Sequence, residues 1–289
     1  MSVTNTIRDL IPGMKSKLPG EAARHAKRAI RREFSLSQVV FAAALLFLFL
    51  PIVVLVVYSF NEAPGMQWTG FSLRWYRQMF ETRELWRAFR NSAVIALSSA
   101  ATATVLGTIG AVGINWYRFK ARAYTQTISF LPMILPEIII GVSLAIFFAS
   151  VRIPLGLLTI YIAHVTFNLP FVFLMVMARL DEFDFSIVEA AQDLGANERQ
   201  TLMRVTMPVC MPGIVAGMLT AITLSLEDFV ITFFVAGAGS STLPIFVHSA
   251  IMRRGGVTPV ISALSVIMIA GTIVLCLALR KFLKYIAAK

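Results

Sequence analysis

The sequence has 289 residues, of which 57% are hydrophobic and only 14% are charged. A mean hydropathy of +0.77 excludes a soluble domain and predicts an all-α, polytopic membrane protein. The net charge of +11 would suit a nucleic-acid-binding protein, but the basic residues stand in loops beside apolar segments, where they act as a topology signal. We therefore expect a lipid bilayer, and no nucleic acid, among the partners.

Residues 1–37 form a basic, polar lead. The apolar run that follows, 39–58, is too long for a signal-peptide core and has no small-x-small cleavage site after it, so it predicts the first span. Together with it, later runs predict a six-span domain over 38–281 and a tail over 282–289. The other predicted spans are 92–116, 128–150, 157–178, 209–236 and 259–279.

Six spans put both termini on the same side of the membrane. The loops on that side hold 18 of the 26 lysines and arginines. The positive-inside rule therefore predicts that both termini are cytoplasmic. The loops concerned are 1–37, 116–127, 179–207 and 280–289.

The outer loop 61–90 contains a segment, 71–90, in which bulky apolar residues alternate with arginines. This pattern predicts an amphipathic segment lying on the outer membrane surface, with aromatic and arginine side chains at the headgroup level. Contact with an extracytoplasmic protein is the alternative role.

Two prolines and a carboxylate interrupt the third predicted span. Pro132 and Pro136 free backbone carbonyls that must then face protein or water, so this span is expected to be broken. Glu137 should lie near mid-membrane, where a carboxylate needs a bundle interior or an aqueous path. It lines a pathway or makes a structural hydrogen bond to a neighbouring helix.

The fifth predicted span carries two adjacent carboxylates, Glu227 and Asp228. On a continuous helix they would point about 100° apart, so at least one should face the bundle interior. There they would attract a cation, and Phe229 and Phe233 could hold an ammonium group by cation–π contact. The alternative is pairing with the basic residues at 253–254 in the next outer loop.

His164 and Asn168 stand one turn apart on the fourth predicted span and could line a pathway, although a hydrogen-bonded core histidine is the interpretation that we favour. The three histidines are scattered, so we expect no metal site and no catalytic residue. The sequence also lacks a Walker A motif, Gly-x-x-x-x-Gly-Lys-Ser/Thr. We therefore expect no cofactor on this chain and ATP on another one, and a stand-alone channel or membrane enzyme remains a remote alternative.

Residues 183–207 form a polar loop between the fourth and fifth spans. Ser186 and Glu189 have the spacing of a capping box, which predicts that Ser186 is the N-cap of a short helix. Gly195 predicts the end of that helix in a left-handed conformation. A second short helix is expected over 197–205. One face of the first helix is small and apolar, so it either seats in a groove of another protein or forms an ordinary surface loop.

Several of these residues carry a resemblance to a known family. Glu189-Ala190-Ala191, Gly195 and the later Val205-Thr206-Met207-Pro208 resemble the EAA loop of bacterial binding-protein-dependent ABC transporter permeases. In that family the loop is cytoplasmic and docks in a cleft of the ATPase, so the resemblance implies a type I ABC importer permease fold. The implied ATPase-coupling residues are Ser186, Glu189, Ala190, Ala191, Asp193 and Gly195.

Similarity to the spermidine/putrescine branch of that family runs from about residue 39 to 279 and includes 225–237. The resemblance implies the second permease of a heterodimeric pair, importing a small cationic amino compound, most simply putrescine or spermidine. The first acid of the pair is Glu227, where many polyamine members have Asp. Related permeases are thought to move opines or aminophosphonates, and these solutes are the alternative substrates. The implied substrate-pathway residues are Glu137, His164, Asn168, Glu227, Asp228, Phe229 and Phe233.

The resemblance also implies the other subunits of the transporter. These are a second homologous permease, two ATPase subunits that bind ATP and magnesium, and a periplasmic or extracytoplasmic substrate-binding protein. The expected location is the bacterial cytoplasmic (inner) membrane.

Overall fold

The computed structural model describes residues 20–64, 67–116, 122–254 and 258–287, and it divides into two units, Met1–Val57 and Tyr58–Lys289. The first unit is described by helix α2 (Gly20–Tyr58), whose apolar part Leu36–Tyr58 has 23 residues and a mean hydropathy of 3.2. At about 1.5 Å per residue this part is long enough to cross a hydrocarbon core. The first nineteen residues of the predicted lead and the last two of the predicted tail lie outside the described residues.

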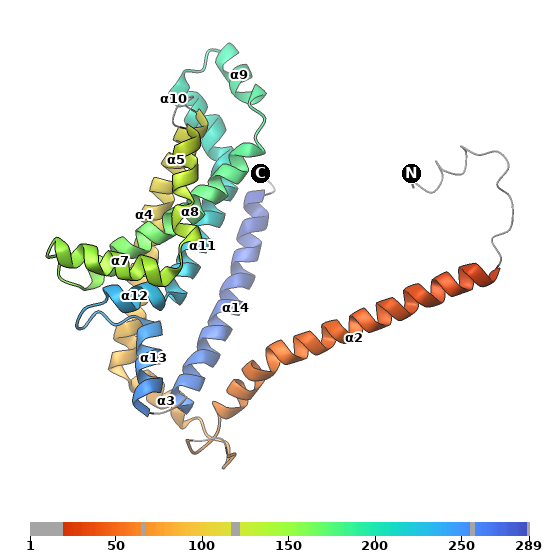
Figure 1. Ribbon diagram of the computed structural model, residues 1–289, viewed down its shortest axis with the longest axis vertical. Coiled ribbons are helices and arrows are strands. Elements are labelled where there is room, and N and C mark those ends of the chain that lie inside the picture. Colours follow the sequence, from red (N-terminus) through yellow and green to blue (C-terminus); the bar gives the residue numbers. More distant parts are fainter. Residues whose placement is uncertain (1–19, 65–66, 117–121, 255–257, 288–289) are drawn as a thin grey trace. The chain divides into compact units, whose positions relative to one another are not determined.

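The second unit is helical throughout its described residues apart from turns, loops and one isolated antiparallel bridge between Asn61 and Phe71. The expected all-α architecture is therefore confirmed. Its helices, traced in Figure 1, are α3 (Arg74–Glu81), α4 (Arg83–Trp116), α5 (Arg122–Ser129), α6 (Leu131–Ile134), α7 (Glu137–Ser150), α8 (Leu157–Asp181), α9 (Ser186–Asp193), α10 (Glu198–Thr201), the π-helical turn η1 (Leu202–Thr206), α11 (Met207–Glu227), α12 (Val230–Val235), α13 (Leu243–Arg254) and α14 (Pro259–Ala287).

The predicted spans correspond to these helices with two differences. Among the described residues, four segments are long and apolar enough to cross a membrane: Leu36–Tyr58, Arg83–Trp116, Leu157–Asp181 and Glu198–Glu227. The third predicted span is divided into α5, α6 and α7, as its prolines indicated. The fifth was expected as one helix over 209–236; that is wrong, because the helix ends at Glu227 and α12 begins three residues later.

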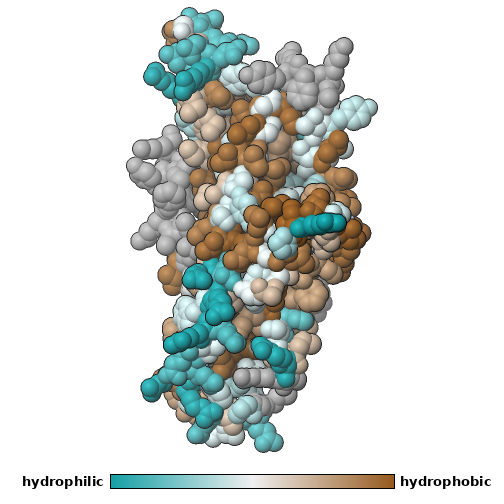
Figure 2. All heavy atoms as spheres, turned by 90° about the vertical axis from the view of Figure 1, so that its left-hand side faces the viewer, coloured by the Kyte–Doolittle hydropathy of each residue, from teal (hydrophilic) through white to brown (hydrophobic). Residues whose placement is uncertain are grey.

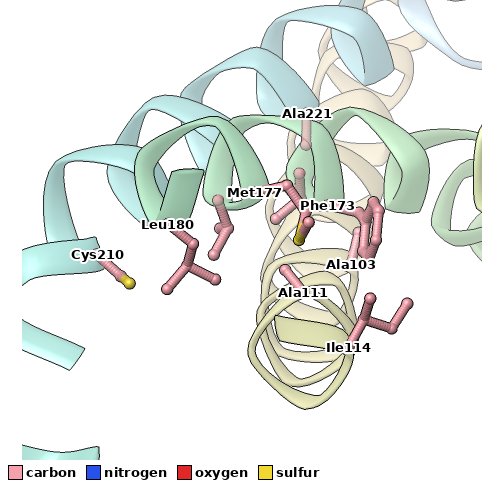
Figure 3. Close-up of a cluster of buried hydrophobic side chains, with 11 residues drawn as sticks. Ala103, Ala111, Ile114, Phe173, Met177, Leu180, Cys210 and Ala221 are labelled. Atoms are coloured by element: carbon pink, nitrogen blue, oxygen red, sulfur yellow. The ribbon is translucent and has the colours of Figure 1, made fainter. Parts of the chain in front are cut away.

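Helices α4, α8 and α11 pack around a common core, which Figure 3 shows from buried residues of all three. Glycines allow this close approach. A Cβ atom on Gly107 of α4 would lie 3.0 Å from the Val172 side chain, and one on Gly217 of α11 would lie 3.1 Å from the Val172 Cα atom. Since packing between membrane helices depends on such small residues, the α8 segment around Val172 is fixed between α4 and α11.

A second core joins the two interrupted spans. Helices α7 and α12 pack against each other and share a buried cluster with α8. At their crossing, a Cβ on Gly141 would lie 2.9 Å from the Phe234 ring and 3.3 Å from the Ile231 backbone. The break in the third span and the break in the fifth are therefore parts of one packed region.

The connecting segments gather at two opposite ends of the second unit. Helices α9 and α10 lie at one end and α3 and α13 at the other, as the sequence predicted for loops on opposite sides of a membrane (Figure 1). Figure 2 shows hydrophobic side chains over the middle of one face and hydrophilic side chains toward its ends. This arrangement suits a bundle whose middle lies in lipid.

The predicted outer amphipathic segment contains α3 and the start of α4. Its Trp75 and Met79 are buried rather than turned to lipid, because α3 packs on α14. Trp75 Nε1 donates a hydrogen bond to the Asn61 carbonyl at 2.6 Å. This face of α3 therefore packs on protein, while Phe71 and Phe80 remain exposed, and anchoring at the membrane surface stays a prediction.

The closest approach made by any described glycine generates a prediction for the fold. A Cβ on Gly237 would lie 1.8 Å from the Leu155 carbonyl oxygen, so Gly237→Ala must push two loops apart. We expect a loss of roughly 1–3 kcal/mol of stability, as for other overpacked sites. The measurement is the apparent Tm of the purified protein in detergent. Gly113→Ala is the control, since nothing lies within 4 Å of its Cβ, and an equal Tm for both variants would contradict the prediction.

Candidate functional site

The break in the fifth span is made by Asp228, which lies between α11 and α12. Its backbone is extended, with φ −62° and ψ 118°, so the α-helix cannot continue through it. The carboxylate turns over the start of α12: Oδ1 accepts a hydrogen bond from the Ile231 N–H at 3.2 Å and Oδ2 accepts one from the Thr232 N–H at 2.8 Å. These bonds satisfy N–H groups that a helix start leaves free. Asp228 therefore acts as the cap of α12.

His164 of α8 contacts the same carboxylate. Its Nε2 atom lies 3.2 Å from Asp228 Oδ2 and 2.8 Å from Thr232 Oγ1, while the Thr232 hydroxyl donates to Asp228 Oδ2. Because the threonine proton is used in that bond, the network assigns a proton to Nε2. The other ring nitrogen, Nδ1, lies 2.6 Å from Ser225 Oγ. His164 is 2% exposed, so the hydrogen-bonded core histidine is the interpretation that the contacts favour.

Glu227 differs from Asp228 in burial and in bonding. Asp228 is buried, whereas Glu227 is exposed and makes no hydrogen bond or ion pair with the described residues. The expectation that at least one of the two acids faces the interior is confirmed, but the two do not share one helix. Arg253 donates to the Ser249 carbonyl instead of pairing with either acid, and the Arg254 side chain lies outside the described residues.

An aromatic cluster begins at the residue after these acids. The ring centroids of Phe229 and Phe233 are 5.5 Å apart, and the Phe229 ring lies 4.6 Å from that of His248 on α13. Phe233 also meets Phe234 edge-on. An exposed carboxylate beside aromatic faces is a combination that attracts an ammonium group.

Glu137 and Asn168 occupy contrasting environments. Glu137 is the first residue of α7, is exposed, and lies near enough to Asp228 for the two negative charges to repel each other. The third and fifth spans thus bring their acids into one region. Asn168 is fully buried, and neither its amide nitrogen nor its amide oxygen has a partner among the described residues.

The predicted polar loop folds as two helices at the end of the second unit opposite α3. The prediction that Ser186 is the N-cap of α9 is wrong, because Ser186 is the first helical residue. The Asp184 carboxylate accepts a hydrogen bond from the Ser186 N–H at 2.9 Å. That backbone hydrogen bond, with one from the serine hydroxyl, holds the pKa of Asp184 below its usual range. The capping residue therefore precedes the predicted one by two positions.

The end of α9 follows the prediction. Gly195 has φ 86°, its N–H donates to the Gln192 carbonyl, and the Ala196 N–H donates to the Ala191 carbonyl. These two bonds form a Schellman motif, which requires the left-handed conformation that glycine adopts without strain.

The apolar face of α9 is largely free. Ile187 and Leu194 are exposed, and so is Ala190, whereas Val188 turns toward the bundle and is buried. Below α9 lies an open cavity of about 520 Å³, lined among others by Trp116 and Phe183. The coupling residues predicted from the motif are thus presented at the surface: Ser186, Glu189, Ala190, Asp193 and Gly195 are exposed and Ala191 is partly buried.

The connection from this loop to the membrane is continuous. Asn197 caps α10 by a reciprocal pair of bonds with Gln200, and α10 runs through the π-helical turn η1 into α11. The second short helix was expected to stop before Pro208; instead it joins the fifth span. A displacement of α10 would therefore reach α11 through one helical path, and α9 contacts both α10 and η1.

Four residues of these sites were missed by the sequence analysis. Thr232 and Ser225 bond the buried acid and histidine, His248 joins the aromatic cluster, and Asp184 caps α9. Asp is a preferred capping residue, and this was the available signal for the cap. Among the described residues, no group of three or more His, Cys, Asp or Glu could hold a metal ion.

Comparison with known proteins gives consistent matches. Residues 103–289 match the family model described as binding-protein-dependent transport system inner membrane component. The chain is 39% identical to the spermidine/putrescine transport system permease protein PotC of Haemophilus influenzae, over 77% of this chain and 86% of the relative. It is 39% identical to the putrescine transport system permease protein PotI of Escherichia coli K12, over 77% and 82%. Identity to the putative 2-aminoethylphosphonate transport system permease protein PhnV of Salmonella choleraesuis is 24%, over 85% and 92%.

Solved structures share the fold. A bacterial alginate ABC transporter in complex with its alginate-bound periplasmic protein matches with a TM-score of 0.69 at 15% identity, over 90% of this chain and 96% of that one. The inward-facing MetNI methionine ABC transporter matches with a TM-score of 0.59 at 19% identity, over 70% and 95%.

The corrected cap of α9 is open to a direct test. Asp184→Ala removes the acceptor of the Ser186 N–H, so this amide should exchange hydrogen faster, and Asp184→Asn should restore much of the protection. Because folding lowers the pKa of Asp184, the cap is complete above its unfolded-state pKa and is lost only as the pH falls through the folded-state value. The measurement is amide hydrogen exchange at neutral pH. Unchanged exchange in Asp184→Ala would show that the carboxylate is not the cap.

Proposed function

This chain belongs to the family of binding-protein-dependent transport system inner membrane components, and we propose its function from that membership. It is a transmembrane permease subunit of an ABC importer, and its substrate is a polyamine, putrescine or spermidine. ATP hydrolysis takes place on separate ATPase subunits.

One observation carries the choice of substrate. Identity to permeases named for spermidine and putrescine is 39% over most of the chain, against 24% for the relative named for an aminophosphonate. The chemistry of the site supports the same choice, since Glu227 and Glu137 are exposed acids with no basic side chain bonded to either among the described residues, and the Phe229–Phe233 pair follows Glu227 in the chain. Two carboxylates suit a solute with two ammonium groups.

The orientation and partners follow from the same premise. The excess of lysine and arginine in the loops around α9 supports a cytoplasmic location for that end of the bundle and for both termini. The exposed apolar face of α9 would dock in an ATPase subunit, and a second homologous permease would complete the pathway. A periplasmic binding protein would deliver the solute at the end that carries α3 and α13. One solved neighbour, the alginate transporter, is a complex with such a protein.

In this mechanism ATP binding brings the ATPase subunits together and displaces α9 and α10. The movement passes through η1 into α11, which ends at the break beside Glu227. Glu227, Glu137 and the Phe229–Phe233 pair would hold the solute during the change from inward-facing to outward-facing states. His164 and Asp228 belong to the wall of this region. An aminophosphonate or opine importer would keep the coupling and change only the solute.

Coupling can be tested at Gly195. Gly195→Asp forces a side chain into the left-handed conformation, at a cost of roughly 1–2 kcal/mol, and adds a charge beside the docking face. We expect ATPase activity that no longer responds to the loaded binding protein, together with loss of uptake. Gly239→Asp is the matched control, because Gly239 also has a positive φ and open space around it but lies in the loop before α13. Normal uptake by Gly195→Asp would remove α9 from the coupling role.

The carboxylate role is tested at Glu227. Glu227→Gln should raise the KM for putrescine roughly tenfold, equivalent to about 1.4 kcal/mol, because a charge contact with one ammonium group is lost. Uptake kinetics in proteoliposomes containing the whole transporter measure this. Glu84→Gln, at an exposed acid in the first turn of α4, should leave the KM unchanged. Equal KM values for wild type and Glu227→Gln would contradict a solute contact.

A further inference from the structure

The hydrogen bonds around Asp228 commit most of its carboxylate to the protein. Four protein donors converge on its carboxylate: the Ile231 N–H, the Thr232 N–H, the Thr232 hydroxyl and His164 Nε2. Three of these donors reach Oδ2 and one reaches Oδ1, so most of the roughly four acceptor positions of the carboxylate are used by the protein. The group is also buried. An ammonium ion could reach it only by displacing bonds that hold α12 in place.

Glu227 has the complementary properties. It is the last residue of α11, directly before the break, and its exposed carboxylate bonds to no described residue. Glu227 projects from the last turn of α11, and the extended backbone at Asp228 ends that turn. Bonds that hold Asp228 in place therefore restrain the end of α11 that carries Glu227.

We propose that His164 and Thr232 are positioning residues that lock the Asp228 cap and thereby hold Glu227 on the solute pathway. This inference rests on the proposed function. It divides the acidic pair into a structural member, Asp228, and a solute-binding member, Glu227.

The lock is anchored in the rigid core. His164 stands two turns before Val172 on α8, the residue enclosed by Gly107 and Gly217, and its Nδ1 side reaches Ser225 on α11. Ser225 in turn lies 3.4 Å, oxygen to oxygen, from Ser99 on α4. The cap of α12 is therefore tied through hydrogen bonds to all three core helices. Loss of Thr232 Oγ1 would remove a donor to the Asp228 carboxylate and an acceptor for His164 Nε2, and the break would loosen.

The main experiment is a double-mutant cycle in the complete transporter reconstituted in proteoliposomes. Thr232→Val removes the hydroxyl and nearly keeps the shape, Thr232→Ser keeps the hydroxyl, and each is combined with Glu227→Gln. We expect Thr232→Val to raise the KM for putrescine about tenfold in the wild-type background and less than about twofold in the Glu227→Gln background, since both act through the same carboxylate.

Controls separate positioning from general damage. Thr232→Ser should restore the wild-type KM, and Thr220→Val should have no effect, because the Thr220 hydroxyl bonds only to its own helix at the Ala216 carbonyl. Assembly with the ATPase and ATPase activity without binding protein should stay unchanged in Thr232→Val. Additive effects of Thr232→Val and Glu227→Gln on the KM would overturn the inference.

A second measurement does not depend on the solute. Glu227→Cys, in a chain with Cys210 and Cys276 replaced, is labelled by a cationic methanethiosulfonate reagent in the assembled transporter. Thr232→Val should change the labelling rate several-fold, and His164→Gln, which keeps one donor, should change it less. An unchanged rate in Thr232→Val would overturn positioning. If Glu227→Gln leaves the KM unchanged while the labelling rate still depends on Thr232, the proposed solute contact fails and the positioning role stands.

Discussion

The constraint on which this structure depends is that hydrocarbon offers no hydrogen bonds to an interrupted helix. Where α11 stops at Glu227, the first N–H groups of α12 would be left unsatisfied, at a cost of several kcal/mol for each group inside a membrane. Asp228 removes that cost by bonding to the N–H groups of Ile231 and Thr232. The buried carboxylate needs donors in turn, and His164 and Thr232 supply them. The buried Asp228 carboxylate is thus stable in the bundle because it accepts hydrogen bonds from backbone N–H groups that the helix break would leave unsatisfied.

The rest of the second unit holds this break in place. Glycines at 107 and 217 let α4 and α11 close on Val172, which fixes α8 and with it His164. Gly141 lets α7 close on α12, so the segment that begins with Glu137 packs beside the break. At the opposite end of α11 the helix is continuous through η1 with α10. One long helical element therefore connects the surface loop at α9 to the acids.

Much of this was predictable from the sequence, and the exceptions have physical reasons. Hydropathy and charge patterning predicted the all-α membrane class, the prolines predicted the broken third span, and Gly195 predicted the end of α9. The break at Asp228 was missed because the apolar run continues past it, so hydropathy shows no boundary. Thr232 and Ser225 look like ordinary small polar residues of a membrane helix until the partner helix is known. The Asp184 cap was missed because Ser186 has Glu189 three residues later, the spacing of a capping box, whereas Asp184 has Ile187 at that distance.

The central claim is that this permease imports a dication by means of exposed acids beside a capped helix break. Uptake of labelled putrescine and spermidine by cells that lack this chain, before and after the wild-type chain is restored, tests it most directly when unlabelled 2-aminoethylphosphonate is included as a competitor. The account predicts that uptake of the polyamines returns and that the aminophosphonate does not compete. Restored assembly in the membrane without polyamine uptake, or uptake abolished by the aminophosphonate, would contradict it.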